Sequence, residues 1–300
     1  MIKLAYSDRF IYALPEGHRF PIEKYQLVKE QLLHEGTIEA GQLFDPGLAS
    51  EEQILAVHTV DYWNKLKSLQ LDQKSVRSIG LPVNETSIKR ARNSVAGTIA
   101  AANHALNDGL GINLAGGTHH AYADYGEGFC VLNDIAISAR ELLAAHKIRK
   151  ALVVDLDVHQ GNGTAKIFQN DHRVFTFSMH GEHNYPLHKE NSDFDIALPQ
   201  GSCDDKYLQL LASNLPKLIA QVRPDIVYYQ AGVDIMKEDR LGKLALTKAG
   251  VKKRDEIVLR SCFQNDIPVT ITMGGGYTKE LKDLIDAHCN TVRMALSIYM

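Results

Sequence analysis

The residues most suited to chemistry lie in the segment 155–163, which reads Asp-Leu-Asp-Val-His-Gln-Gly-Asn-Gly. Two carboxylates and an imidazole alternate there as Asp155, Asp157 and His159, directly after the apolar stretch 151–154. Along an extended strand these positions share one face, so the three side chains are expected to point into one small space. Such groups bind a divalent metal or support its ligands. The segment therefore predicts a metal site at the end of a buried strand.

A second carboxylate comes from Asp234, which follows the apolar segment 226–230. Asp157, His159 and Asp234 together offer one imidazole nitrogen and two carboxylate oxygens, a set that suits a divalent metal with one position open for water. An open position is typical of a catalytic site. For an isolated Asp-x-His the alternative is a hydrogen-bonded strand end, and the third residue favours the metal.

A pair of histidines, His119 and His120, follows two glycines and a threonine. A histidine that acts as acid or base needs its far ring nitrogen held by a carboxylate or an amide. Asp155 and Asn162 flank the predicted metal ligands and are available for this purpose. A surface loop is the alternative from spacing alone, and these partners favour acid–base chemistry.

The segment 274–277, Gly-Gly-Gly-Tyr, forms another candidate element of the site. Its backbone can approach a ligand closely, and Tyr277 can point a hydroxyl group into the site. A phosphate-binding loop is the alternative. It is disfavoured because no Gly-Lys-Ser/Thr follows and no Gly-x-Gly-x-x-Gly opens a helix after the first strand.

The elements that must position these residues form an alternating pattern. Apolar, β-branched segments alternate with helical patterns, which predicts a single α/β domain over residues 1–300 with a mainly parallel central sheet covered by helices. The polar segments all follow strands, and ligands bind at that carboxyl edge in open sheets. We therefore expect one convergent site. The predicted strands are 2–5, 111–114, 151–157, 174–178, 226–230 and 268–273, and the predicted helices are 22–34, 50–57, 87–107, 134–145, 206–221, 247–265 and 279–297.

The composition is that of an ordinary globular protein. Hydrophobic residues make up 45% of the 300 residues, and the net charge of −3 without a basic tract argues against sequence-specific nucleic-acid binding. No apolar run reaches the ~20 residues of a membrane span and no signal-peptide region is evident, so we expect no membrane association and a cytoplasmic location. The four cysteines form no C-x-x-C pair, which argues against a disulfide framework or a zinc ribbon.

Taken in order, the motifs resemble those of the histone deacetylase superfamily, which has the arginase-like α/β fold. The resemblance runs from the segment 14–21, Leu-Pro-Glu-Gly-His-Arg-Phe-Pro, through His58-Thr59 and the histidine pair to the segment 274–277. It implies a three-layer fold with the active site at the carboxyl ends of the strands. It also implies a zinc-dependent amidohydrolase that removes acetyl or longer acyl groups from lysine side chains of proteins or peptides.

The resemblance assigns roles to the candidate residues. Asp157, His159 and Asp234 would hold one zinc ion per chain, which lowers the pKa of bound water and polarises the substrate carbonyl. His120 would act as general base and later as acid. The catalytic set would be completed by His119 paired with Asp155, by Asn162, and by Tyr277 as donor to the oxyanion.

The resemblance further implies a second cation site and a substrate tunnel. Asp155 and Ser178 match an inner monovalent-cation site, usually filled by potassium, for which ordinary turn hydrogen bonding is the alternative. Gly128, Phe129 and Tyr185 match the tunnel walls. Aromatic faces suit the methylene stem of an acyl-lysine, although core packing is the alternative for Phe129.

One departure concerns the partner of His120. Gln160 and Asn162 stand where many relatives carry His and Asp, and with the segment 14–21 they resemble the class IV branch and its bacterial relatives. An amide can orient the imidazole ring but cannot stabilise an imidazolium by charge. We therefore expect His120 to stay neutral to lower pH than in carboxylate-paired relatives.

Three alternative functions follow from the same residues. An arginase-like ureohydrolase shares the fold but carries a further carboxylate for a second metal, where this chain has Gly161. An acetylpolyamine amidohydrolase shares the metal chemistry and differs in the residues at the rim, so an acylated polyamine is the alternative substrate. A catalytically silent scaffold that binds acyl-lysine or protein partners would be expected to lack a ligand or the tyrosine, and this chain retains Asp157, His159, Asp234, His120 and Tyr277.

Overall fold

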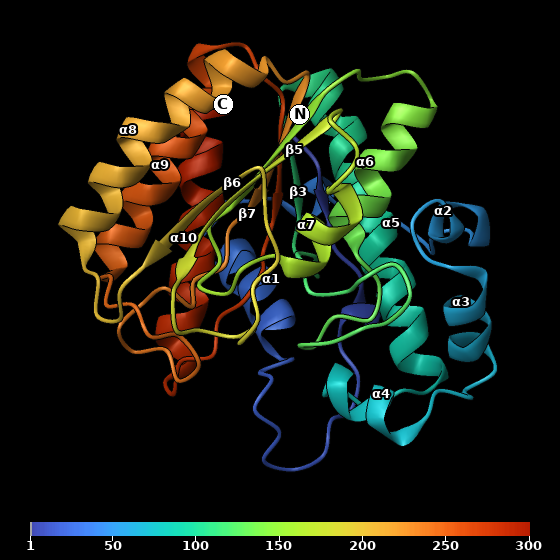
Figure 1. The fold of residues 1–300 in the computed structure, drawn as a ribbon. Coiled ribbons are helices and arrows are strands. Elements are labelled where there is room, and N and C mark those ends of the chain that lie inside the picture. The colour runs from blue at the N-terminus through green and yellow to red at the C-terminus, as the bar shows by residue number, and fades with distance from the viewer. Residues whose placement is uncertain (1) are drawn as a thin grey trace.

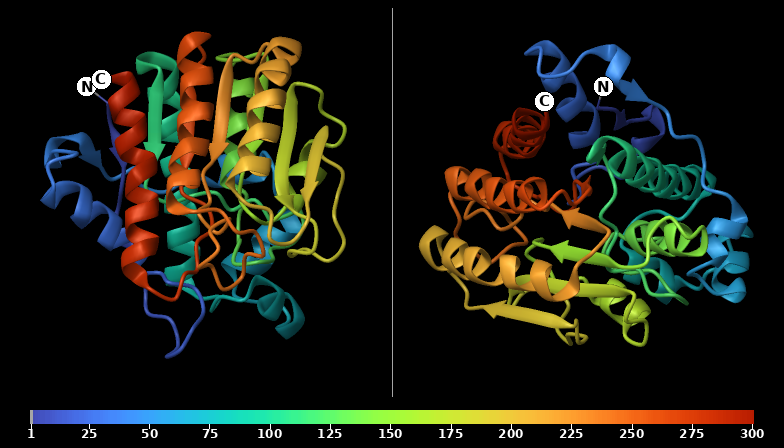
Figure 2. Two further views of the ribbon diagram at one scale, coloured as in Figure 1. Left: turned by 90° about the vertical axis from the view of Figure 1, so that its left-hand side faces the viewer. Right: turned by 90° about the horizontal axis from the view of Figure 1, so that it is seen from above.

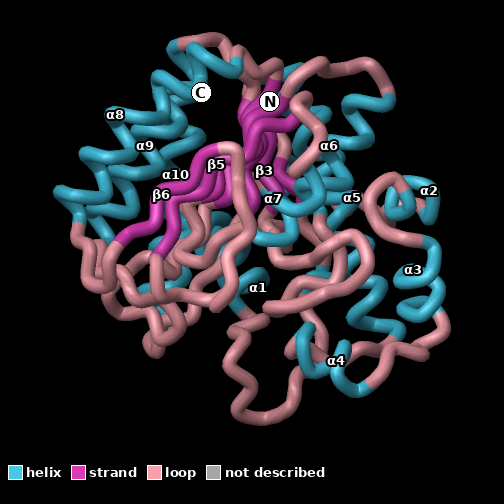
Figure 3. The backbone as a smooth tube through the Cα atoms, viewed as in Figure 1, coloured by secondary structure: helices cyan, strands magenta, loops and turns pink. Residues whose placement is uncertain are grey.

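The central sheet contains eight strands, and every neighbouring pair runs parallel. The computed structural model describes residues 2–300. The strands are β1 (Leu4–Ala5), β2 (Leu43–Phe44), β3 (Leu110–Asn113), β4 (Ala151–Asp155), β5 (Val174–Gly181), β6 (Phe194–Leu198), β7 (Ile226–Gln230) and β8 (Val269–Thr272). Their order in the sheet is β2-β1-β3-β8-β7-β4-β5-β6. The strands, magenta in Figure 3, lie between helices on either side. Parallel sheets are covered on both faces, and accordingly every residue of the central strands β4 and β7 is buried.

Helices cover both faces of the sheet and complete three layers. They are α1 (Lys24–His34), α2 (Glu51–Leu55), α3 (Val60–Lys67), α4 (Gln73–Ile79), α5 (Glu85–Asp108), α6 (Asp134–Ala144), α7 (Asn162–Phe168), α8 (Asp204–Val222), α9 (Lys248–Gln264) and α10 (Leu281–Tyr299). On one side of the sheet lie α8, α9 and α10, and on the other lie α5, α6 and α7 (Figure 1). All strands of the sheet point in one direction, and the loops that follow them gather at their carboxyl ends (Figure 2, left).

The long helix α5 shows how the sequence fixes these elements. The side chain of Asn84 accepts a hydrogen bond from the backbone N–H of Ser87 (2.9 Å) at its start, and Gly109 ends it with a φ of 83°. Gly111 on β3 allows the helix to pack closely, because a Cβ there would collide with the backbone of Ala101. This packing fixes β3, which leads into the loop with the histidine pair.

Every strand and helix predicted from the sequence is present, with ends that differ by no more than three residues, and the sheet is parallel throughout. The sequence pattern misses the edge strands β2 and β6 and the helices α3, α4 and α7. In β6, exposed and half-buried side chains alternate, as is typical of a strand at the edge of a sheet. In α7, the helix begins at Asn162, inside the polar segment 155–163. Across residues 2–300, no helix combines the length and apolar character needed to cross a bilayer.

Candidate active site

Asp157, His159 and Asp234 come together beyond the carboxyl ends of β4 and β7. One nitrogen or oxygen atom of each lies within 4.8 Å of the others, and all three side chains are buried. His159 Nδ1 lies 3.0 Å from Asp157 Oδ1 and 3.1 Å from Asp234 Oδ2. In the part of the chain that the structure describes, this is the one group of His, Cys, Asp or Glu with such geometry.

The expectation that Asp155, Asp157 and His159 share one face of a strand is wrong. Strand β4, predicted over 151–157, ends at Asp155, and residues 157–159 form a bend in which Asp157 Oδ1 accepts a hydrogen bond from the backbone N–H of His159 (3.0 Å). The bend brings Asp157 and His159 to Asp234. Asp155 serves a different partner, since its Oδ2 lies 2.7 Å from Nδ1 of His119.

The residues around this group fit a divalent cation. Asp234 Oδ2 is buried and, apart from the approach of His159 Nδ1, has no polar partner that forms a hydrogen bond with it among residues 2–300. Burial, followed by the charge of Asp157, raises the pKa of Asp234 to about 7, because two carboxylates face each other. A side chain at Gly275 would collide with Asp234 Oδ2, so the glycine keeps space beside the carboxylates. Mixed nitrogen and carboxylate donors around such a space suit zinc and similar metals.

Backbone amides orient the two carboxylates. The N–H of Gly275 donates to Asp157 Oδ2 (2.7 Å), and the N–H of Val158 donates to Asp234 Oδ1 (2.9 Å). Each bond engages one carboxylate oxygen and leaves the other directed toward His159. The loop that carries the glycines and Tyr277 therefore helps to position Asp157, which together with His159 and Asp234 forms the candidate metal group.

The two histidines of the pair differ in their partners. Burial alone would lower the pKa of His119, but the charges of Asp155 and Asp157 and the hydrogen bond to Asp155 outweigh burial and raise that pKa to about 9. His120 Nδ1 lies 2.6 Å from Asn162 Oδ1. Burial, followed by the charges of His119 and His159, lowers the pKa of His120 well below its ordinary value. These surroundings favour a neutral His120 that can accept a proton and a protonated His119.

A pocket of about 280 Å³ leads from the surface to this group. Its inner end is formed by His120, His159 and Tyr277, and its lining includes all three residues predicted for the tunnel walls, Gly128, Phe129 and Tyr185. The mouth and remaining walls are formed by Arg19, Arg77, Ser78, Ile79, Gly80 and Leu241. The structure therefore gathers the predicted wall, base, metal and tyrosine residues around one cavity.

Gly128 controls the width of this pocket. Its φ of 55° lies in the left-handed region, and a Cβ there would lie 2.6 Å from His120 Cδ2 and 3.1 Å from Tyr185 Cε1. Both the backbone conformation and the space beside the base ring therefore require glycine.

Tyr277 is buried at the inner end of the pocket. Its backbone N–H donates to Asp239 Oδ2 (2.6 Å), and its ring centroid lies 6.3 Å from that of His159. Burial, followed by the charges of Asp234 and Asp157, raises the pKa of the Tyr277 phenol. The hydroxyl group therefore stays protonated and can donate a hydrogen bond to an oxygen beside the metal group.

Asp155 and Ser178, the predicted potassium ligands, are register partners on β4 and β5. Ser178 Oγ lies 2.9 Å from His180 Nδ1, and Asp155 Oδ1 accepts a hydrogen bond from the N–H of Asp157 (3.2 Å). The two side chains are thus neighbours and take part in local hydrogen bonds, and potassium binding stays a prediction.

Two buried cations near the site were not singled out from the sequence. On α9, the guanidinium of Arg254 donates to the carbonyl oxygen of Leu156 (3.3 Å), directly before Asp157, and to that of Gly232, two residues before Asp234. Lys24 Nζ donates to the carbonyl of Gly274 (2.9 Å) in the tyrosine loop. A signal existed for Arg254, because it falls on the buried stripe of α9, three residues after one apolar side chain and four before the next. Lys24 likewise falls on the buried face of α1, four residues before Val28 and eight before Leu32.

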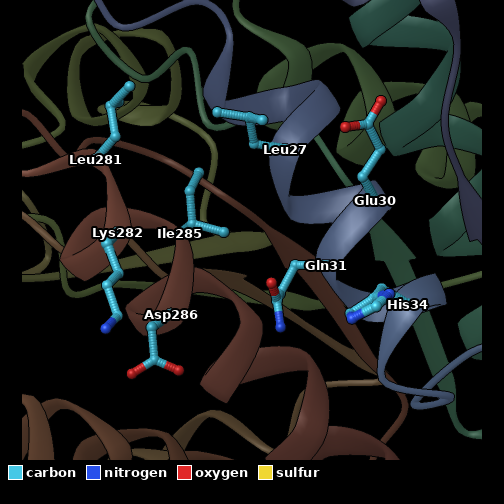
Figure 4. Close-up of a pocket in the computed structure, with 8 residues that line it drawn as sticks. All are labelled: Leu27, Glu30, Gln31, His34, Leu281, Lys282, Ile285 and Asp286. Carbon is cyan, nitrogen blue, oxygen red and sulfur yellow. The ribbon is translucent and has the colours of Figure 1, made fainter.

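A larger pocket, of about 720 Å³, lies between α1 and α10 (Figure 4). Its lining side chains are Leu27, Glu30, Gln31, His34, Leu281, Lys282, Ile285 and Asp286. They come from two helices outside the sheet, and within the described residues they include no metal-binding cluster. The smaller pocket at the strand ends is therefore the candidate active site, because its lining residues can do chemistry and those of the larger pocket include no metal-binding cluster.

Sequence comparisons link the chain to one family. The family model described as "Histone deacetylase domain" matches residues 18–292. An uncharacterized protein of Picosynechococcus sp. is 45% identical over 296 residues, which cover 99% of each chain. Histone deacetylase 2 of Arabidopsis thaliana is 32% identical over 290 residues, which cover 93% of this chain and 75% of that protein.

Solved structures share the fold. An HDAC homolog complexed with SAHA has a TM-score of 0.83 at 24% identity, over 99% of this chain and 84% of that chain. An HDAC homolog from Aquifex aeolicus has a TM-score of 0.82 at 23% identity, over 98% and 84%. The family match across most of the chain and the Arabidopsis relative extend this likeness from fold to sequence. This protein belongs to the histone deacetylase family.

Proposed function

We propose that this protein is a zinc-dependent amidohydrolase that removes acetyl or longer acyl groups from lysine side chains of proteins. Family membership supports a deacetylase acting on acylated lysine or polyamine in general. The observation that carries the proposal is the single pocket at whose inner end His120, Tyr277 and the metal group meet. A base, a hydroxyl donor and a metal group that meet at the inner end of one pocket can act together on a single amide bond, as its hydrolysis requires.

Asp157, His159 and Asp234 would hold the zinc ion. One imidazole nitrogen and two carboxylate oxygens leave room for water or substrate at the remaining position. When bound, zinc lowers the pKa of a water molecule and polarises the amide carbonyl. A single group of this kind among residues 2–300, with Gly161 packed against Asp155, supports one divalent metal rather than an arginase-like pair.

The chain's own residues would move the proton and stabilise charge. His120, neutral in its buried setting, would take a proton from the attacking water and then deliver it to the departing lysine amine. Asn162 holds the far side of the His120 ring during both steps. The positive charge on His119, supported by Asp155, would offset negative charge that develops on the substrate, and the Tyr277 hydroxyl would donate to the oxyanion.

The pocket walls suit a linear apolar stem. Phe129 and Tyr185 face a passage that Gly128 keeps open, and four methylene groups of an acyl-lysine would lie against these aromatic faces. Beyond His120 and Tyr277 a small inner cavity of about 30 Å³ remains. A cavity of that size holds one or two water-sized groups, which favours an acetyl group over a long acyl chain.

The charge at the mouth favours lysine over polyamine. Arg19 and Arg77 are exposed and line the pocket, and none of its twelve lining residues is Asp or Glu. A polyamine keeps a second positive charge close to the scissile amide, which two arginines would repel. A lysine side chain of a protein brings no such charge into the mouth, so a protein substrate is the better match.

Two finer assignments rest on local contacts. We retain Asp155 and Ser178 as proposed potassium ligands, supported by their pairing across β4 and β5. The class IV assignment rests on Gln160 and Asn162. Gln160 Nε2 donates to the carbonyl oxygen of Glu190 (2.7 Å), so this residue braces the loop after β5 rather than the base.

The test is an assay of the purified, zinc-loaded protein on acetyl-lysine peptides, long-chain acyl-lysine peptides and acetylated polyamines. We expect the acetyl-lysine peptide to give the highest kcat/KM. In Tyr277→Phe, loss of one oxyanion donor should lower kcat about 10²–10³-fold, with the fold unchanged by circular dichroism. Zinc removal by a chelator should abolish turnover, and added zinc should restore it.

The same assay separates the alternatives. Faster turnover of acetylated polyamines would replace the protein substrate with a polyamine. Binding of acyl-lysine peptide without turnover by the zinc-loaded protein would indicate a scaffold. Turnover that Tyr277→Phe leaves unchanged would contradict the proposed chemistry.

A further inference from the structure

We infer that Glu127 is a positioning residue that fixes the amide of Asn162 and, through it, the ring tautomer of His120. This inference rests on the proposed role of His120 as the base. Glu127 lies directly before the wall residue Gly128, in a loop of the pocket. Its Oε1 accepts a hydrogen bond of 2.6 Å from Asn162 Nδ2, while Asn162 Oδ1 lies 2.6 Å from His120 Nδ1. The three side chains thus form a chain of hydrogen bonds that leads away from the metal group.

The direction of each bond follows from the chemistry of Glu127. A carboxylate can only accept hydrogen bonds, so the NH₂ group of Asn162 must face it. The amide oxygen then faces His120 and can only accept, so the proton of the neutral ring must lie on Nδ1. Nε2 of His120 is left with a free lone pair. That tautomer is the one required of a base whose Nδ1 side faces away from the substrate.

A second partner of Asn162 cannot set this direction. Asn162 Nδ2 also donates to Tyr122 Oη (3.1 Å), whose own proton goes to Glu190 Oε1 (3.2 Å). A phenol hydroxyl can donate as well as accept, so Tyr122 could equally donate to the oxygen of a reversed amide. Glu127 alone, among the residues in contact with Asn162, permits only one orientation.

Burial makes the orientation costly to reverse. Asn162 is 1% exposed and His120 is 4% exposed. A reversed amide would place its oxygen against the carboxylate of Glu127 and its NH₂ group against the protonated Nδ1 of His120. Unsatisfied polar groups in such surroundings are destabilising, because they have lost their hydrogen bonds to water. Replacing the carboxylate removes this penalty and lets the amide and the tautomer exchange.

The charge of Glu127 also acts on Tyr185 in the tunnel wall. Burial, followed by the charge of Glu127 and a hydrogen bond to it, raises the pKa of the Tyr185 phenol. Tyr185 packs edge-on against the His120 ring, with centroids 5.1 Å apart. The carboxylate of Glu127 therefore influences a residue of the pocket wall as well as Asn162.

The test compares Glu127→Gln with Glu127→Leu. Glutamine keeps an acceptor oxygen for Asn162 but can also donate, so Glu127→Gln should hold the amide only partly and lower kcat clearly less than Glu127→Leu. Leucine should lower kcat about 10–100-fold with KM nearly unchanged. Asp124→Leu is the matched control, because Asp124 is an exposed carboxylate in the same loop with no hydrogen bond to Asn162. We expect its kinetics to match wild type.

Ring ¹⁵N spectra of histidine-labelled protein test the tautomer without any substrate. The His120 signals, assigned with His120→Gln, should show a proton on Nδ1 in wild type and Asp124→Leu, and a mixture of tautomers in Glu127→Leu. A wild-type tautomer and kcat in folded Glu127→Leu would overturn the inference. So would a loss in Glu127→Gln equal to that in Glu127→Leu, since charge and not position would then be the cause.

If Glu127→Leu does not fold, a double variant in which the carboxylate and the amide exchange positions provides a second test. Asn162→Asp alone places two carboxylates together and should lose most activity. Adding Glu127→Gln restores a donor opposite the new carboxylate and should recover at least tenfold in kcat. No recovery would overturn the inference. An inactive wild type would instead defeat the proposed function, and the ¹⁵N spectra would still decide the tautomer.

Discussion

His119 and His120 are consecutive in the chain and equally buried, yet the structure gives them opposite partners. Nδ1 of His119 meets the carboxylate of Asp155, whereas Nδ1 of His120 meets the amide of Asn162. The pKa of His119 rises to about 9, and that of His120 falls well below its ordinary value. Burial lowers both, so the difference comes from the partners and their surroundings. This difference supports the proposed roles, in which His119 holds charge and His120 transfers a proton.

The largest expected effect comes from removing the two rings separately. His120→Ala should lower kcat about 10²–10⁴-fold, because the proposed base and acid is lost. His119→Ala should cost at least tenfold less, because only electrostatic support is lost. Steady-state kinetics on an acetyl-lysine peptide, with zinc content measured for each variant, checks both. Equal losses would show that the two histidines do not divide the work.

A pH profile sharpens the comparison by giving His120 a carboxylate partner. In the double variant Asn162→Asp with Glu127→Gln, the new carboxylate stabilises the imidazolium and raises the pKa of His120. The base must be neutral, so the acidic limb of kcat/KM should move to higher pH, by about one unit or more. Zinc content at each pH separates this shift from metal loss. An unmoved acidic limb would show that the amide does not keep His120 neutral.

The sequence predicts much of this arrangement because the important residues follow strands. Asp157, His159 and Asp234 stand at or just after strand ends and are of ligand type, and Asp155 and Asn162 were available to the histidines on either side. The bend after β4 was not predictable, since nothing in the segment 155–163 marks where pairing with β5 and β7 stops.

Residues that act through tertiary contacts left no pattern in the sequence. Glu127 lies between two glycines, with no periodicity to show that it would meet Asn162, 35 residues later. Arg19 and Arg77 come from distant segments that only the folded chain brings to one pocket mouth. Such contacts depend on the packing of loops against the sheet, which local propensity does not encode.

The smallest expected effect is the loss of stability when His119 loses its carboxylate partner. The pKa of His119 rises from an ordinary 6.5 to about 9 on folding, so its contribution to stability is fully present below pH 6.5 and is lost as pH rises through 9. Asp155→Asn removes the main cause of that rise. Thermal unfolding between pH 6 and 9 should therefore show a Tm difference, wild type minus variant, of a few degrees at pH 6 that shrinks toward pH 9. A difference that grows with pH would contradict this assignment.

The most direct test of the division between the two histidines is a pH titration of both rings by ¹⁵N NMR in the zinc-loaded protein. We expect His119 to carry two ring protons at neutral pH and to lose one only at a clearly higher pH than His120. His120 should keep a single proton, on Nδ1, down to mildly acidic pH. A His120 ring that becomes doubly protonated at the same pH as His119, or at a higher one, would contradict the account.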